Sequence, residues 1–507
     1  MIKAASVVRG EIVGQSVTPA SAAQLGPADR VGIAECTAVH GRANCDRALT
    51  IVSVPESFAQ LTPFPCVLLE EHGSNCPQSL MRSGGLHGSG RQVQAATYVG
   101  RYPPLYYAIV GLPSLVWHTS TAVYLMRLVS GLLTAVMVGL ALALSSVWSG
   151  SRLLVLAVAV AATPCVLIFG SNVNPSGLEM AASLSVWTGG LVLVLDHAER
   201  PPPSLVYGTA AAAIVMVLTR GLSPFWLILI GLSLVAVAPR SLPVLTQSRA
   251  VRISGAAVAV AAVAAVGYVL WAHTLSVYPL GITIPSSTSS TGILGLALGR
   301  TWSLAGEFIG TFDSAEPSPP ILAIGLWAGV ASGLVVFGLV ASLRRQAAVL
   351  LSLIAASLVV PTLVMVSQAR HVGLVWQARD GFPLYVGIIL VAGAVGGRNL
   401  GLSPDWFRDP SSLRGSFERL AVLVAVAVAA VQLVEVVWAL RAYTGGFSAT
   451  FHPRWWDPPL PVLLLIVMSV LAAGFYGWWI RYLSRAREVP AVAAAPLRLS
   501  DDSVVTD

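Results

Sequence analysis

The run AVYLMRLVSGLLTAVMVGLALALSSV, residues 122–147, decides the fold class of this chain. Its only charged residue is Arg127, and no proline interrupts it. A helix needs about 20 apolar residues to cross the hydrocarbon core of a bilayer. Residues 122–147 are therefore predicted to form a transmembrane helix.

The rest of the chain repeats this pattern. Hydrophobic residues make up 55% of the 507 residues and charged residues only 10%, whereas soluble globular proteins carry about 25% charged residues. The predicted fold class is an all-α polytopic membrane protein with about eleven transmembrane helices. They are expected at residues 122–147, 152–170, 176–195, 204–219, 222–239, 252–274, 319–341, 347–366, 381–396, 417–440 and 459–481.

Four of the five cysteines, Cys36, Cys45, Cys66 and Cys76, precede the first predicted span. Their spacing suits two local disulfides, 36–45 and 66–76, which require an oxidising compartment. A zinc site is an alternative, although zinc-binding cysteine pairs usually stand two to four residues apart. Free thiols are a third. Cys165 lies inside an apolar run and is predicted to be a buried thiol.

The arginines indicate the orientation. If the cysteine-bearing segment is outside, fourteen arginines fall on the cytoplasmic side and six in outer loops after the first span. This matches the positive-inside rule, so the net charge of +7 reflects topology and not nucleic-acid binding. The chain is predicted to reside in the cell membrane, with an extracytoplasmic segment and interfacial helix (1–120), a transmembrane domain (121–482) and a disordered cytoplasmic tail (483–507).

Polar residues gather in the outer connections. In GSNVNPSGLE, residues 170–179, Ser176 and Glu179 have the S-x-x-E spacing of a helix capping box. A direct functional role is the alternative, because a helix start aimed at a cavity also attracts anions. Asn174 precedes a proline in the same turn and is a candidate for a substrate contact.

Three arginines in the outer connections are candidate phosphate ligands. Arg370 and Arg379 close a repeated Gln-Ala-Arg, and Arg220 lies between two closely spaced spans. The planar guanidinium suits phosphate oxygens, although a solvated or snorkelling arginine is the alternative. Tyr102 could stack on a sugar or belong to the interfacial aromatic belt.

Several motifs are missing from the sequence. It has no D-x-D, no glycine-rich phosphate loop, no H-E-x-x-H and no G-x-S-x-G. These patterns place the groups that nucleotide-sugar enzymes, ATPases, zinc proteases and serine hydrolases need. Their absence disfavours those classes.

Seven segments together resemble a known family. KAASVVRGEIVG, GRYPPLYYAIVGLPS, YLMRLVSG, GSNVNPSGLEMA, FIGTFDSAEPSPP, WQARDGFPLYVG and WALRAYTGGF occur in that order over nearly the whole chain. As a set they resemble the bacterial integral-membrane family known as domain of unknown function 2142. That family is similar to the C-type glycosyltransferases, polytopic enzymes that take a sugar from a polyprenyl-phosphate carrier at the outer face of the membrane.

The chain departs from the family pattern in two places. The family usually has a first span and an acidic motif before a segment like Lys3–Gly14, so the resemblance implies that Met1 is a misassigned start within an outer loop. QARDGFPL keeps Arg379 of a Gln-Gly-Arg-Tyr-like run, with Ala378 and Asp380 in place of the glycine and tyrosine.

The resemblance implies a polyprenyl-phosphate-sugar-dependent glycosyltransferase in cell-envelope glycan or glycolipid assembly. A carboxylate would deprotonate the acceptor hydroxyl, with Glu179 or Asp313 as the acid in this chain. Arginines, with or without a divalent cation, would hold the leaving phosphate. The alternatives are a transporter or flippase for a lipid-linked saccharide, although no internal repeat typical of transporters is present, and a non-catalytic membrane scaffold.

Overall fold

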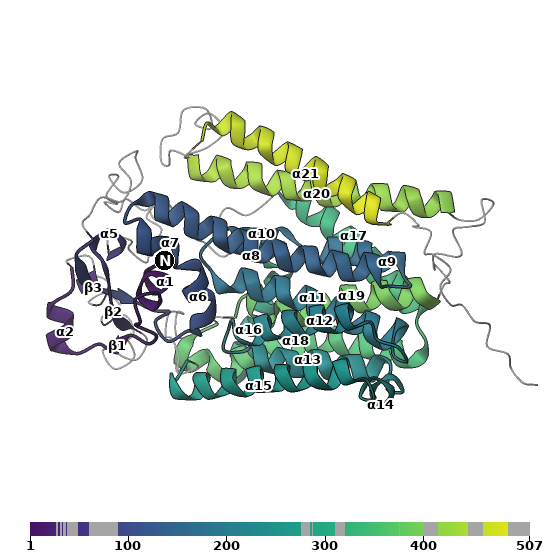
Figure 1. Cartoon of the computed structure of the whole chain (residues 1–507), viewed down its shortest axis with the longest axis horizontal. Coiled ribbons are helices and arrows are strands. Elements are labelled where there is room, and N and C mark those ends of the chain that lie inside the picture. The colour runs from purple at the N-terminus through teal and green to yellow at the C-terminus, as the bar shows by residue number, and fades with distance from the viewer. Residues whose placement is uncertain are drawn as a thin grey trace, which may run out of the picture.

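The computed structural model describes residues 1–26, 29–30, 33, 37, 49–59, 90–274, 284–285, 287–309, 320–374, 376–399, 414–444 and 460–484. Its main body consists of long helices that run roughly along the longest axis of the molecule (Figure 1). They are α8 (Ser120–Val147), α9 (Arg152–Ala161), α10 (Pro164–Ser171), α11 (Pro175–Asp196), α12 (Pro203–Val217), α13 (Ser223–Val237), α14 (Ser241–Leu245), α15 (Arg249–Trp271), α16 (Ser290–Glu307), α17 (Ile321–Ala341), α18 (Arg344–Val372), α19 (Ala378–Asn399), α20 (Arg414–Thr444) and α21 (Val462–Ser484).

Within the described ranges, eight helices are long and apolar enough to cross a membrane, namely α8, α11, α15, α17, α18, α19, α20 and α21. The pair α9 and α10 makes a ninth if it is one broken span. Helices α12 and α13 are apolar but have 15 residues each, which is about 22 Å of helix against a hydrocarbon core of about 30 Å. All eleven predicted runs are thus helical and the chain is multi-pass, but the count of eleven spans stays a prediction.

The break between α9 and α10 has a local cause. The two helices are bent by 54° across a short gap. Pro164 occupies the first turn of α10, and Thr163 before it is extended. Proline lacks an N–H for the preceding turn and disfavours helical geometry in the residue before it. The sequence therefore stops α9 and restarts the chain in a new direction.

Helices α11 and α19 form the centre of the bundle, since 83% of the apolar window of each is buried. Small residues allow the close approach: a Cβ on Gly387 of α19 would lie 2.5 Å from the ring of Trp187 on α11. The indole N–H of Trp187 donates to the carbonyl of Pro383 across 2.7 Å. This hydrogen bond sets the position of α19 along the axis of α11.

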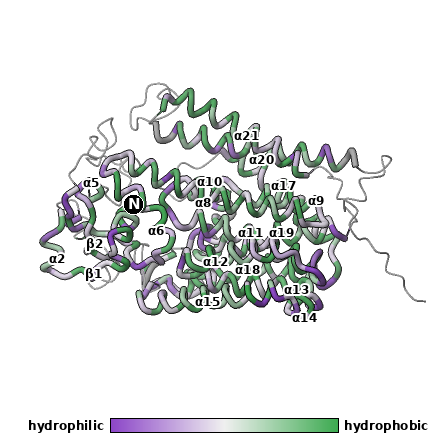
Figure 2. The backbone as a smooth tube through the Cα atoms, in the orientation of Figure 1, coloured by the Kyte–Doolittle hydropathy of each residue, from purple (hydrophilic) through white to green (hydrophobic). Residues whose placement is uncertain are grey.

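The peripheral helices have the opposite character. Only 17% of the apolar window of α15 and of α17 is buried, and 6% of that of α21. Figure 2 shows their tubes predominantly in the hydrophobic colour. Apolar side chains such as Leu322 on α17 and Leu471 on α21 are well exposed. Such surfaces suit contact with lipid tails and not with water.

The N-terminal part of the chain forms a small mixed unit at one end of the bundle (Figure 1). Its elements are α1 (Ile2–Val7), β1 (Gln15–Ser16), α2 (Pro19–Ala23), β2 (Thr50–Pro55), α5 (Glu56–Ala59), β3 (Gln92–Thr97), α6 (Pro104–Val110) and α7 (Pro113–Val116). The strands form an antiparallel sheet in the order β1-β2-β3, in which Thr50 pairs with Thr97.

This sheet corrects the all-α prediction. The protein is mostly helical, but β2 and β3 pair across about 40 residues of intervening chain. Long-range pairing of two short strands leaves little signal in a sequence, because each strand alone resembles any short apolar run. The unit shares its apolar core with the bundle, where Tyr106 and Val54 belong to one cluster with Met126 of α8 and Leu178 of α11.

Several predictions concern residues beyond the described ranges. Cys36, Cys45, Cys66 and Cys76 lie there, so the disulfides stay a prediction, as does the tail after residue 484. Cys165 is a buried thiol, as predicted, and its Sγ lies 4.0 Å from the sulfur of Met180. Helix α16 was not predicted from the sequence, because its residues include the polar side chains of Arg300, Ser303 and Glu307 and fall below the hydropathy of a span.

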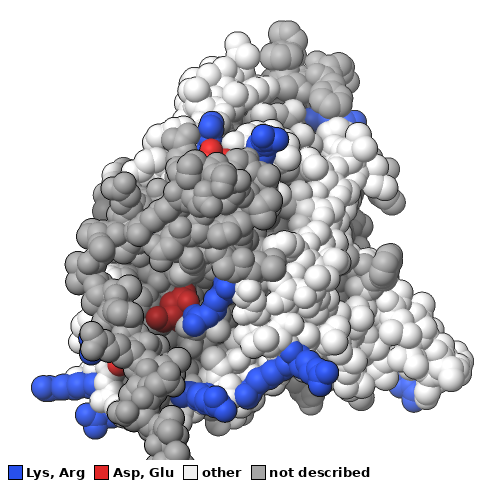
Figure 3. All heavy atoms as spheres, turned by 90° about the vertical axis from the view of Figure 1, so that its right-hand side faces the viewer, with Lys and Arg blue, Asp and Glu red and all other residues white. Residues whose placement is uncertain are grey.

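The end of the bundle opposite the N-terminal unit is basic. Figure 3 shows arginine side chains distributed over the described part of this face, with few Asp and Glu between them. The connections after α11 and α13 carry Arg200 and Arg240, and Arg152 and Arg344 are the first residues of α9 and α18. These arginines belong to the loops that the sequence assigns to the cytoplasm, and that orientation stays a prediction.

Candidate functional site

Three charged side chains meet at the end of the bundle near the N-terminal unit. Arg220 lies in the turn between α12 and α13. Its Nη1 is 2.9 Å from Oε2 of Glu179 on α11, and its Nη2 is 2.8 Å from Oδ1 of Asp380 on α19. Ser223 donates its hydroxyl to Oε1 of Glu179 across 2.5 Å. We call Glu179, Arg220, Ser223 and Asp380 the charged cluster.

The start of α11 places Glu179. The side chain of Asn174 accepts a hydrogen bond from the amide of Ser176 at 3.0 Å, and Pro175 occupies the first turn. Asn174 is therefore the N-cap, and Glu179 lies one turn further in, fully buried. The capping-box interpretation of Ser176 and Glu179 was wrong, because a capping box needs its acid three residues after the cap.

The start of α19 places Asp380. Its Oδ2 accepts from the amide of Gln377 at 3.1 Å, which is the reciprocal bond of a capping box. Glu307 at the end of α16 accepts from the amide of Ala378 at 2.9 Å and pairs with Arg300 at 2.6 Å. Two carboxylates thus satisfy amides that the first turn of a helix leaves without partners.

The members of the charged cluster differ in exposure. Glu179 is completely buried, whereas Asp380 retains 20% of its side-chain exposure and Arg220 15%. Burial opposes the charge on Arg220, but the carboxylates of Glu179 and Asp380 outweigh it and raise the pKa of the guanidinium above its ordinary value. Arg220 therefore stays a cation, and its charge is more than balanced by two carboxylates.

Two tyrosines lie near the charged cluster. Tyr102 and Tyr107 are both within electrostatic range of Arg220. Burial raises the pKa of Tyr107 well above its usual value, so its hydroxyl stays neutral. Of the two, Tyr102 is partly exposed and was predicted from the sequence.

The two Gln-Ala-Arg arginines occupy different environments. Arg379 is partly buried next to Asp380, with its guanidinium 5.0 Å from the ring centroid of Phe169, and its Nε has no hydrogen-bond partner among the described residues. Arg370 is exposed near the end of α18, where its Nη2 donates a long hydrogen bond of 3.4 Å to the carbonyl of Thr288. Asp313 lies outside the described residues.

Asp380 and Ser223 are the members of the charged cluster that were not chosen as site residues from the sequence. Asp380 follows Arg379 directly, and an acid beside an outer arginine was the available signal. Ser223 offered none, because serine at the start of an apolar helix is common as a cap.

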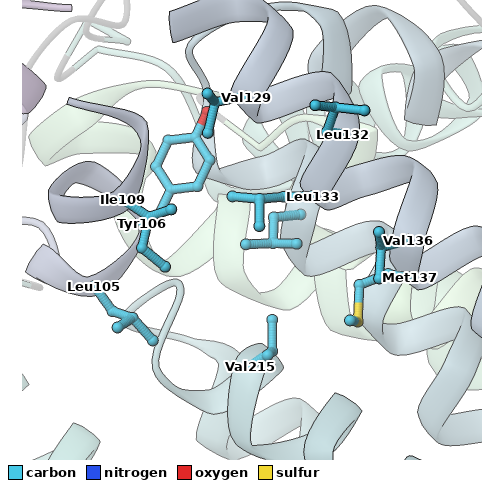
Figure 4. A pocket seen from close by; sticks show the side chains of 10 residues that line it. Leu105, Tyr106, Ile109, Val129, Leu132, Leu133, Val136, Met137 and Val215 are labelled. Carbon is cyan, nitrogen blue, oxygen red and sulfur yellow. The ribbon is translucent and has the colours of Figure 1, made fainter. Parts of the chain in front are cut away.

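An apolar pocket of about 210 Å³ lies between α6, α8, α11 and α12. Its lining consists of Leu105, Tyr106, Ile109, Val129, Leu132, Leu133, Val136, Met137, Leu178 and Val215 (Figure 4). The hydroxyl of Tyr106 bonds to Ser130 at 2.8 Å. Leu132 and Val136 are more than half exposed, so the pocket opens on the apolar surface of α8.

Two residues of the pocket lining lie close to members of the charged cluster along the polypeptide. Leu178 of the lining directly precedes Glu179. Val215 of the lining accepts at its carbonyl from the hydroxyl of Thr219, the residue before Arg220. The apolar pocket and the charged cluster are therefore built from neighbouring positions of the same segments of the chain.

No group of three His, Cys, Asp or Glu side chains that could hold a metal ion occurs within the described part of the chain. The divalent cation considered from the sequence stays a prediction.

Comparison with known proteins gives one family and one solved structure. The model of the family described as predicted membrane protein (DUF2142) matches residues 84–388. The crystal structure of ArnT from Cupriavidus metallidurans bound to undecaprenyl phosphate is 14% identical, with a TM-score of 0.36, over 76% of this chain and 66% of that chain, just under two thirds of its length. A TM-score of 0.36 is below the level that indicates a shared fold. No curated protein matches the sequence.

Proposed function

The chain belongs to the DUF2142 family of predicted membrane proteins, whose model matches residues 84–388, and from this membership we propose that it is a membrane glycosyltransferase. The proposed donor is a sugar linked to polyprenyl phosphate, and the acceptor is a cell-envelope glycan or glycolipid. The reaction takes place at the outer face of the membrane, on the side of the N-terminal unit.

One observation carries this proposal: the charged cluster lies beside a pocket with a wholly apolar lining. A lipid-linked sugar has a hydrocarbon chain, a phosphate and a polar sugar in that order. The pocket of about 210 Å³ suits part of the hydrocarbon chain. The charged cluster follows the pocket lining closely along the polypeptide, since Glu179 comes directly after Leu178 and Arg220 comes shortly after Val215. Binding sites commonly combine an apolar lining with a few convergent polar groups.

Arg379 is the proposed phosphate ligand, with Arg370 as an outer helper. The Nε of Arg379 has no protein partner within the described ranges, and a guanidinium binds phosphate oxygens through parallel N–H bonds. Arg220 is balanced by Glu179 and Asp380, which favours a positioning role over the phosphate-binding role assigned from the sequence. Glu179 is likewise favoured as a structural acid. Asp313 lies outside the described residues, so its candidacy as an acid rests on the sequence alone.

Sugar or acceptor contacts are assigned to Tyr102, which is partly exposed and near Arg220. Asn174 is the weaker candidate, because its side-chain oxygen already caps α11.

The test uses the full chain in lipid nanodiscs with a set of polyprenyl-phosphate-linked hexoses and pentoses and an envelope glycolipid fraction as acceptor. The transferase proposal expects release of free polyprenyl phosphate together with transfer of labelled sugar to the glycolipid. In vesicles, movement of the intact donor between leaflets without release would instead favour a flippase. Neither release nor movement with any donor would leave the scaffold function as the better one.

A further inference from the structure

We infer that Asp380 is the base that removes the proton from the acceptor hydroxyl, and that Glu179 and Arg220 are the residues that position it. This inference rests on the proposed transferase function and deepens it. It assigns a role to a residue at the start of α19 that the sequence did not single out.

Exposure separates the two acids of the cluster. A base has to come within hydrogen-bond reach of the proton that it abstracts. Glu179 has no exposed surface, and its two oxygens are already bonded to Arg220 and Ser223. Asp380 has 20% of its side chain exposed. Of the two carboxylates, only Asp380 can meet a substrate.

Asp380 also has acceptor capacity left. An ionised carboxylate has about four lone-pair positions. The described contacts of Asp380 use one position for Arg220 and one for the amide of Gln377. Each oxygen therefore retains a lone pair for an incoming hydroxyl.

A series of hydrogen bonds holds Arg220, the partner of Asp380, in place. Arg220 is held by Glu179 at 2.9 Å, and Glu179 is held in turn by Ser223 at 2.5 Å. Glu179 lies on α11, Arg220 in the α12–α13 turn and Ser223 at the start of α13. The pair of Glu179 and Arg220 therefore orients the carboxylate of Asp380, as supporting hydrogen bonds orient catalytic side chains in enzymes.

The position of Asp380 fits the geometry of the transfer. It is adjacent in sequence to Arg379, the proposed phosphate ligand, at the same end of α19. An acceptor hydroxyl beside Asp380 would then approach a sugar whose phosphate is held by Arg379.

The proposed step balances as follows. The acceptor oxygen attacks C1 of the sugar, and its proton passes to the carboxylate of Asp380. The bond between C1 and the phosphate oxygen breaks, and polyprenyl phosphate leaves with the electron pair. No oxidant, reductant or further reactant is needed.

A purely structural role for Asp380 is the competing explanation, because the residue caps α19 and pairs with Arg220. The chain supplies a matched control. Asp196 has the same bonding pattern at the other end of the bundle, with Oδ1 on Arg398 and Oδ2 accepting from the amide of Gly150 at 2.9 Å. Asp196→Asn reports what the loss of such a structural carboxylate costs.

The experiment compares Asp380→Asn, Asp380→Ala and Asp196→Asn with the unchanged chain in nanodiscs, using labelled polyprenyl-phosphate-linked sugars. Asparagine keeps an oxygen for Arg220 or Gln377 but is not a base. Asp380→Asn is expected to lower sugar transfer by about 10²–10⁴-fold, the usual contribution of a general base, while Asp196→Asn leaves transfer near that of the unchanged chain.

Azide separates catalysis from positioning, because it attacks C1 without losing a proton. With azide added, Asp380→Ala is expected to form glycosyl azide and to release polyprenyl phosphate. The inference is overturned if Asp380→Asn transfers sugar as well as Asp196→Asn does, or if Asp380→Ala forms no glycosyl azide. If the unchanged chain releases no polyprenyl phosphate from any donor, the transferase proposal fails and the role of Asp380 falls with it.

Discussion

Arg220 and Glu179 are 41 residues apart in the chain, and their side chains meet across 2.9 Å inside the end of the bundle. The carboxylate of Glu179 has no exposed surface. Removing such a carboxylate from water costs several kcal/mol, which the partner has to offset. The pair therefore ties the α12–α13 turn to α11, and the position of Asp380 depends on that tie.

Replacement of Arg220 by Gln is expected to destabilise the protein by about 3–5 kcal/mol, because it leaves Glu179 buried without a cation. Thermal unfolding of the detergent-solubilised chain measures the effect. Arg398→Gln is the control, since Arg398 pairs with Asp196 but is 45% exposed and should contribute about 0–1 kcal/mol. Equal shifts for the two variants would contradict the buried support. The double variant Glu179→Gln with Arg220→Gln should recover part of the loss.

Replacement of Arg379 by Ala is expected to lower transfer by about 10²–10³-fold, as the loss of one electrostatic group at a reacting centre typically does. The protein should stay folded, because the Nε of Arg379 has no hydrogen-bond partner among the described residues and the guanidinium lies 5.0 Å from the ring centroid of Phe169. Transfer in nanodiscs and the unfolding temperature are measured together. Arg344→Ala at the far end of α18 is the control and should be silent. Unchanged transfer in Arg379→Ala would favour the scaffold function.

Val136→Trp should weaken binding of polyprenyl phosphate roughly tenfold, or about 1.4 kcal/mol, by filling the pocket that Val136 lines. Native mass spectrometry of the chain with added polyprenyl phosphate measures occupancy. Leu128→Trp is the matched control, because Leu128 is exposed on the same helix outside the pocket lining. If both variants bind the lipid as the unchanged chain does, the pocket does not hold the hydrocarbon chain.

Gly177→Ala should cost about 1–3 kcal/mol, the usual penalty of overpacking. A Cβ at Gly177 would lie 2.4 Å from the backbone nitrogen of Gly170, so α10 and α11 would have to separate. Gly139→Ala on α8 meets nothing within 4 Å and should gain about 0.5–1 kcal/mol from its helix propensity. The two unfolding temperatures should move in opposite directions, and a shift of the same sign would disprove the close approach.

Lys3, the only lysine, gives a pH dependence. It is fully buried and donates to the carbonyls of Ile12 and Gly100. Burial lowers its pKa from 10.5 to about 8, and nearby Glu11 opposes the shift. Between about pH 8 and pH 10.5 the unfolded chain therefore binds more protons than the folded chain. This residue thus makes stability rise with pH in that window and adds no pH dependence below it.

The difference in unfolding free energy between the unchanged chain and Lys3→Met isolates this contribution from that of the tyrosines. The difference should change between about pH 8 and pH 10.5 in favour of the unchanged chain. A flat difference over the window would show that Lys3 is solvated in the folded protein.

Membrane class, family and the positions of the helical runs could be predicted from the sequence, because they depend on local composition. A single apolar run such as residues 122–147 crosses a bilayer as a helix, because a helix forms its backbone hydrogen bonds within the same segment. The resemblance to the family rested on short ordered motifs and is confirmed by the match over residues 84–388. The structure brings Arg220 close to Glu179 and Tyr102, which follows from outer connections that meet at one end of the bundle, and their roles in a site stay predictions.

Other features escaped the sequence for identifiable reasons. The pairing of β2 with β3 depends on contacts between segments far apart in the chain. Helix α16 was missed because its hydropathy falls below that of a span. The capping-box interpretation of Glu179 failed because the helix begins at Pro175, so its cap is Asn174 and not Ser176. Because the cap lies two residues earlier than expected, Glu179 is not a capping acid but a buried partner of Arg220.

The sequence by itself determined that this protein crosses a membrane and which charged residues stand among apolar ones, because the hydropathy of a run depends only on the residues in that run. Only the tertiary structure decided which charges are paired. It brought Glu179, Arg220 and Asp380 together from three separate segments of the chain, close to an apolar pocket. It left the carboxylate of Glu179 buried and that of Asp380 partly exposed. Charge pairing acts over a few ångströms, and the chain reaches those distances only when the helices pack.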